Sequence, residues 1–74
     1  MVHLQNYRKN AGFVTQEAVA KKMNVNRASV ARWELGITYP NQKRLFQLAQ
    51  LYDTTIEAIL IACKNAHENR QNSA

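Results

Sequence analysis

The window from Gln16 to Leu35 constrains the fold more than any other segment. It holds two helical apolar patterns separated by a turn of three to four residues, the length that joins two steeply crossing helices. Such a pair needs a small residue where the backbones meet and a turn residue that tolerates positive φ, and Ala20 and Asn24 supply them. The residues available to anchor both helices in one core are Val19, Met23, Val25, Val30 and Trp33. The window predicts two helices joined by a tight turn.

Apolar residues keep helical spacing along the rest of the chain, and no stretch shows sustained strand alternation. The residues expected to begin or end helices are Gly12, Thr15, Asn26, Gly36, Pro40, Asn41 and Thr55. The last two helices are expected to bury Leu45, Leu48, Ala49, Tyr52, Ile56, Ile59, Leu60 and Cys63. The sequence therefore predicts an all-α fold of five short helices, with one domain over residues 1–67 and a polar, frayed tail over residues 68–74.

Positive charge is concentrated in the first two-thirds of the chain. The formal net charge is +5, and residues 1–50 carry eight basic and two acidic side chains, whereas residues 51–74 carry two basic and three acidic ones. The first part therefore suits a polyanionic partner, and the last part does not. A basic composition alone is weak evidence for nucleic acid, so the position of the basic residues matters more.

One face of the third expected helix lies opposite the core. On a wheel of about 100° per residue, Val30 and Trp33 point inward. The outer arc holds Arg27, Ala28, Ala31, Arg32 and Leu35. Arginine can donate twice to a guanine edge and an alanine methyl can contact the thymine methyl, so this slim basic face suits the major groove of DNA. The alternative is that this face is simply solvated. That interpretation is weaker, because the face carries no acidic residue.

Arg8 is a basic residue on the apolar stripe of the first expected helix, four residues after Leu4. A charge on a buried stripe needs an acidic partner. Within the first fifty residues the acids are Glu34 and Glu17, and Glu17 is expected to be exposed. We therefore predict a structural ion pair between Arg8 and Glu34. Orientation of the third helix is its alternative, functional interpretation.

The sequence argues against several other classes of protein. There is one cysteine, so no internal disulfide forms, and no Cys/His cluster has metal-ligand spacing. No nucleophile–base pair, phosphate loop or acid–base dyad is visible, so we expect no enzyme, no cofactor and no small-molecule ligand. No stretch reads as a signal peptide, and the longest apolar run, residues 58–63, is too short to span a membrane. We expect a cytoplasmic protein without a membrane partner.

Three segments resemble the phage-repressor and Cro-like helix-turn-helix family of the Xre type: TQEAVA at residues 15–20, VNRASVARWELG at residues 25–36, and YP at residues 39–40. The resemblance covers about residues 4–60. It implies a compact five-helix, lambda-repressor-like domain that binds a palindromic operator in double-stranded DNA, usually as a homodimer. The expected function is a sequence-specific transcriptional regulator, a repressor or autoregulator. The alternative is a helix-turn-helix protein-interaction module of the antitoxin or anti-repressor type.

The resemblance also implies roles for individual residues. Those that would read bases from the third helix are Asn26, Arg27, Ala28 and Arg32. Those that would contact the DNA backbone are Gln16, Thr38, Asn41, Lys43 and Arg44. The chain departs from the family pattern at Leu35, where a polar or basic residue is common, and in a linker before the second helix that is one residue longer than usual.

A dimer contact is expected in the near-neutral last third of the chain, because like charges would face one another in the basic part. Once the expected core of the fifth helix is assigned, Ile61 and Ala62 lack an obvious intramolecular partner. They are the candidate contacts of a weak homodimer that forms mainly on DNA.

Overall fold

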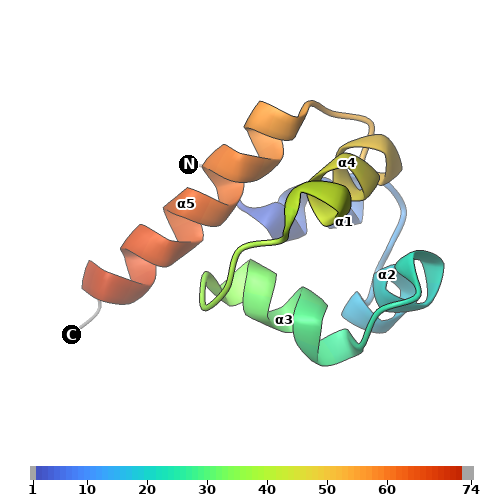
Figure 1. The fold of residues 1–74 in the computed structure, drawn as a ribbon, viewed down its shortest axis with the longest axis horizontal. Helices are drawn as coiled ribbons and strands as arrows, with labels where there is room; N and C mark the ends of the chain where they lie inside the picture. Colours follow the sequence, from blue (N-terminus) through green and yellow to red (C-terminus); the bar gives the residue numbers. More distant parts are fainter. Residues whose placement is uncertain (1, 73–74) are drawn as a thin grey trace.

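The structure, a computed structural model, describes residues 2–72. Within them the chain forms five α-helices and no strand: α1 (Leu4–Asn10), α2 (Gln16–Met23), α3 (Arg27–Leu35), α4 (Gln42–Leu51) and α5 (Ile56–Asn72) (Figure 1). The predicted all-α, five-helix fold is confirmed.

Short polar side chains fix where three of the helices begin. Thr15 Oγ1 accepts a hydrogen bond from the backbone N–H of the third residue of α2 at 3.1 Å, and Asn41 and Thr55 do the same for α4 and α5 at 2.9 and 3.0 Å. These bonds satisfy N–H groups that have no acceptor within the helix. Asn26 occupies the corresponding position before α3, but its side chain makes no capping hydrogen bond.

The turn between α2 and α3 depends on one residue in the left-handed conformation. Asn24 has φ 58° and ψ 48°, as the sequence predicts, and the N–H of Val25 then donates to the carbonyl of Ala20 at 2.9 Å. The chain reverses within three residues. This tight turn lets α3 follow α2 directly and pack against it.

The core receives side chains from all five helices. The largest fully buried side chains are Leu4, Val19, Val30, Leu48, Ile59 and Cys63. Helix α2 packs mainly on α3, whereas α5 packs against α4, α3 and α1 (Figure 1). Trp33 is 6% exposed and belongs to the same core, so it anchors α3 from its inner side. The outer side of α3 stays uncovered.

Helix α3 ends where it meets the backbone of α5. Gly36 has φ 75°, and a Cβ atom added to it would lie 2.3 Å from the backbone nitrogen of His67. The Nδ1 atom of His67 also lies 3.1 Å from the carbonyl oxygen of Gly36. Glycine is required here both for its positive φ and for this close approach.

The buried face of α5 differs from the predicted one. Ala62 is 1% exposed and Leu60 is 38% exposed, so both predictions are wrong: Ala62 belongs to the core and cannot be a dimer contact, and Leu60 lies at the surface. The buried residues, Ile59, Ala62, Cys63 and Ala66, follow one stripe at i, i+3, i+4 and i+7. Two alanines on that stripe let α5 approach α3 closely. Ile61 is 58% exposed, as expected.

Helix α5 is also longer than expected. It continues to Asn72, so residues 68–72, which the sequence assigned to a frayed tail, are helical. The tail's last two residues, 73 and 74, lie outside the described part of the chain.

Candidate nucleic-acid interface

The uncovered face of α3 carries the side chains that the helical wheel places there. Arg27, Ala28 and Arg32 are exposed, and Leu35 is 57% exposed. Asn26, just before the helix, is exposed too, and its side chain is not used for capping. The structure therefore places all four expected base-reading residues on one accessible surface.

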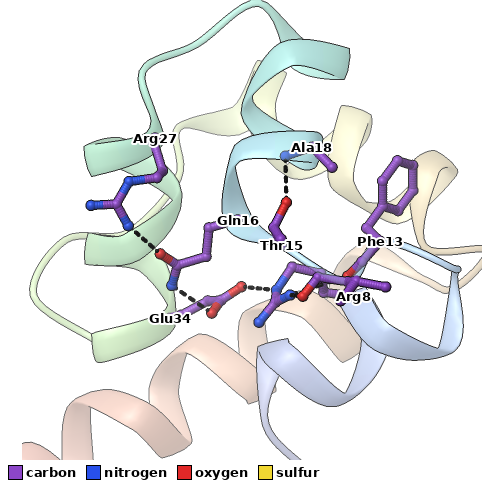
Figure 2. A network of polar contacts seen from close by, with 8 residues as sticks. Arg8, Phe13, Thr15, Gln16, Ala18, Arg27 and Glu34 are labelled. Atoms are coloured by element: carbon purple, nitrogen blue, oxygen red, sulfur yellow. Dashed lines mark hydrogen bonds and ion pairs between the residues drawn. The ribbon is translucent and has the colours of Figure 1, made fainter.

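Arg27, the first residue of α3, is held by a residue of α2. Its Nη1 atom donates to Gln16 Oε1 at 3.0 Å (Figure 2). Among residues 2–70, whose side chains the structure describes, no other hydrogen bond to this guanidinium is present. The edge formed by Nε and Nη2 thus keeps two parallel N–H donors, the arrangement that matches the two acceptors of guanine.

Gln16 is in turn bound to a buried carboxylate. Its Nε2 atom donates to Glu34 Oε1 at 2.9 Å, and Arg8 Nε donates to Glu34 Oε2 at 2.7 Å (Figure 2). The side chains of Arg8 and Glu34 are 8% and 4% exposed, so the ion pair predicted from the sequence is present and buried. Each carboxylate oxygen has its own donor.

Arg8 also fixes the connection between α1 and α2. Arg8 Nη1 donates to the carbonyl oxygens of Phe13 at 3.1 Å and Val14 at 2.6 Å. These two residues belong to the linker between α1 and α2. These partners could not be predicted from the sequence, because a backbone acceptor in a loop has no residue type that identifies it.

The expected backbone contacts fall into two groups. Thr38, Asn41 and Lys43 are exposed in or next to the loop that leads into α4. Arg44 is half-buried and already engaged, since its Nη1 atom donates to Gln47 Oε1 at 2.8 Å and to the carbonyl of Met23 at 3.4 Å. Arg44 therefore ties α4 to the end of α2.

Two helices, α2 and α4, begin with residues that belong to the expected backbone contacts. The N-terminal N–H groups of α2 and α4, together with the helix dipoles, favour an anion such as a phosphate. Gln16 is the first residue of α2 and is half-buried, and Lys43 lies in the first turn of α4. The candidate interface thus includes the exposed Arg27 guanidinium and two helix starts that suit a phosphate backbone.

Two ionisable groups whose pKa values are raised, Cys63 and Tyr52, lie in the core. Burial raises the pKa of the Cys63 thiol to about 11. Burial and the nearby charge of Glu34 raise the pKa of Tyr52 above its ordinary value. In the described part of the chain, no cluster of three or more His, Cys, Asp or Glu side chains is placed to hold a metal ion. None of the described helices has the length and apolar character to cross a membrane.

Comparisons with known proteins found similarity over most of the chain. A helix-turn-helix family model matches residues 4–59. The chain is similar to the HTH-type transcriptional activator BcrR of Enterococcus faecalis, with 34% identity over 47 residues, which is 64% of this chain and 23% of that protein. The chain thus spans less than a quarter of this relative's length. No solved structure matches significantly.

Proposed function

Because the chain belongs to the helix-turn-helix family of the Cro/C1 type, we propose that it is a sequence-specific regulator of transcription that binds double-stranded DNA. The observation that carries this proposal is the free edge of the Arg27 guanidinium at the start of an uncovered helix. A helix of this kind enters the major groove with its N-terminal residues against the base edges. The relative's description as a transcriptional activator agrees with a role in regulation.

In this arrangement α3 supplies the sequence preference. Arg27 donates twice to a guanine, Ala28 offers its methyl group to a thymine, and Asn26 contacts the adjacent base. Arg32, one turn further along the exposed face, reaches a second base pair or the phosphate at the groove wall.

The flanking groups supply affinity without sequence preference. Thr38, Asn41 and Lys43 contact phosphates, as do the N–H groups at the start of α2 and the second N–H of the Gln16 amide. Arg44 adds positive charge there while its guanidinium holds α2 and α4 together. Each phosphate contact contributes to the salt dependence of binding.

We further infer that two copies bind a palindromic operator as a homodimer that forms mainly on DNA. Ile61, exposed on α5, is the candidate contact, and Leu60 beside it is exposed as well. Occupation of an operator by such a dimer excludes other proteins from the site, so a repressor or autoregulator is the simplest role, with no catalytic step.

Selection of binding sites from random duplex DNA at a stated salt concentration tests the proposal. We expect enrichment of a palindrome with one critical guanine per half-site. Arg27→Ala should weaken operator binding by about 1–3 kcal/mol and binding to random DNA much less. Lys64→Ala removes the same charge from an exposed position on α5 and is the matched control.

The alternative function, a protein-interaction module, is less well supported by the surface. The centre of a protein interface is usually poor in charge and rich in aromatic residues. The uncovered face of α3 instead carries two arginines. If selection enriched no sequence, and binding to DNA were as strong at high salt as at low salt, the DNA-binding proposal would fail.

A further inference from the structure

The polar network at the start of α2 runs without interruption from the interior to the surface. Glu34 is 6% exposed, Gln16 is half-buried and Arg27 is exposed. The two hydrogen bonds that join them measure 2.9 and 3.0 Å (Figure 2). A buried carboxylate is therefore linked through one amide to the exposed guanidinium that faces the expected ligand.

The chemistry of the two ends fixes the direction of the Gln16 amide. A carboxylate accepts hydrogen bonds and a guanidinium donates them, so the amide must turn its NH₂ group toward Glu34 and its oxygen toward Arg27. The reversed amide would place oxygen against the carboxylate and N–H groups against the cation. Both contacts would then be repulsive, and Arg27 would lose its acceptor.

We propose that Glu34 is a positioning residue for base recognition, which acts through Gln16 to hold the Arg27 guanidinium in its reading orientation before DNA binds. The inference rests on the proposed function and extends it to a residue that touches no DNA. A free arginine side chain samples many rotamers, and ordering it in advance reduces what is lost on binding.

The ion pair alone does not account for the arrangement around Glu34. Arg8 uses only one carboxylate oxygen, and the other is taken by Gln16. Arg8 is itself fixed by the backbone of the α1–α2 connection. The carboxylate is thus a rigid anchor with one oxygen committed to the amide that holds Arg27.

Gln16→Met is the sharpest test, because it keeps the side-chain length, removes both hydrogen bonds and leaves the ion pair intact. The measurement is the ratio of affinities for the selected operator and for the same operator with the guanine at the Arg27 position replaced. We expect this ratio to fall about 5- to 10-fold in the wild-type background and to stay unchanged in the Arg27→Ala background. Gln42→Met, at the exposed first residue of α4, is the matched control and should leave the ratio unchanged.

A second measurement uses the free protein. The order parameter of the Arg27 Nε–H group, measured by NMR, should be high in the wild type and low in Gln16→Met. It should also be low in Glu34→Gln, provided that this variant keeps the wild-type fold by circular dichroism.

The outcomes separate the two proposals. If the wild type selects an operator but Gln16→Met weakens binding to both duplexes equally, Gln16 is a phosphate contact only and the positioning role is overturned. An Arg27 group that is equally mobile in the wild type and in Gln16→Met overturns it as well. If the wild type selects no sequence, the proposed function fails, and this inference falls with it.

Discussion

The charges of Arg8 and Glu34 are tolerated in the interior only because each side chain neutralises the other. Their side chains are 8% and 4% exposed, and the Nε–Oε2 distance is 2.7 Å. A buried pair of this kind stabilises little in comparison with well-packed apolar residues, but the loss of one partner leaves an isolated buried charge. The effect of a substitution here therefore depends on which partner remains.

Glu34→Ala should lower the free energy of unfolding by about 3–5 kcal/mol, because the Arg8 guanidinium stays buried without its counter-ion. Urea unfolding followed by Trp33 fluorescence measures the change. Glu17→Ala, at an exposed acid in α2, should change stability by less than about 0.5 kcal/mol. A loss for Glu34→Ala no larger than that of Glu17→Ala would contradict the prediction.

Tyr52 presents the opposite case, a buried polar atom without a partner. Its hydroxyl oxygen is inaccessible to solvent and makes no hydrogen bond in the described part of the chain. Tyr52→Phe should therefore leave stability at pH 7 unchanged or raise it by about 1 kcal/mol. Tyr39→Phe, at a 44% exposed tyrosine, is the control and should have no effect.

The same substitution should change the response to alkali. The folded chain keeps the Tyr52 proton to a higher pH than the unfolded chain does, so stability from this group is complete below pH 10.0 and is lost as the pH rises above it. Cys63 behaves in the same way between pH 9.0 and about 11. Above pH 10, Tyr52→Phe should lose less stability than the wild type. The loss of stability that is due to Cys63 should remain in the variant. Parallel loss in the two proteins would contradict the assignment.

At the scale of residues, the buried ion pair could be predicted from the sequence, but the hydrogen bonds of Gln16 could not. The Arg8–Glu34 pair was predictable, because a basic residue on an apolar stripe had one suitable acid available. The bonds of Gln16 to Glu34 and Arg27 were not predictable, since they depend on how the start of α2 lies across both ends of α3 in space.

A residue can occupy the N-cap position of a helix without making a capping hydrogen bond, as Thr15 and Asn26 show by contrast. Thr15→Ala should lower the free energy of unfolding by about 1 kcal/mol, because the N–H of Ala18 loses its acceptor. Asn26→Ala should cost only a few tenths of that, because the Asn26 side chain caps nothing. Thermal unfolding of both variants checks the difference. Equal losses would show that Asn26 caps α3 in solution.

The end of α3 is predicted to tolerate substitution poorly. Gly36→Ala should cost about 2–5 kcal/mol, since it combines a positive φ of 75° with a Cβ atom 2.3 Å from the α5 backbone. Gly12→Ala is the matched control: this glycine also has positive φ, but a Cβ would meet nothing within 4 Å. If the two variants unfolded at the same denaturant concentration, the close approach of α3 and α5 would not be the cause.

At the scale of elements, capping residues predicted where α2 to α5 begin, and glycines predicted where α1 and α3 end, because each leaves a local signal. No such signal indicated which face of α5 turns toward the core. Residues 58–63 are all apolar, so periodicity could not choose between faces. The choice falls on the face with Ala62 and Ala66, because only small side chains fit against Gly36 and its neighbours. Leu60 was consequently assigned to the wrong side.

At the scale of the whole molecule, assembly depends on the apolar side chains that α5 leaves outside. Ile61→Lys should reduce the stoichiometry on operator DNA from two chains to one, because a charge would be buried at the dimer contact. Sedimentation with an operator duplex measures this. Phe46→Lys, at a 53% exposed position on α4, makes the same kind of change and is the control. Unchanged stoichiometry for Ile61→Lys would exclude Ile61 from the interface.

The arrangement of the helices as a whole followed from the sequence further than the single contacts did. The window from Gln16 to Leu35 specified two helices and a tight turn, and α2 and α3 do pack on one another. The position of α5 across α1, α3 and α4 was not specified, because the contacts between distant segments have no local signature.

The contact of Gly36 with α5 has a mechanical consequence. The backbones of α3 and α5 lie too close at Gly36 for a side chain between them, so this contact resists sliding or rotation of α3 along α5. A protein fused to α5 through a stiff helical connection would therefore set the angle at which α3 is presented. The length of that connection, changed one residue at a time, would turn the recognition surface by about 100° per step.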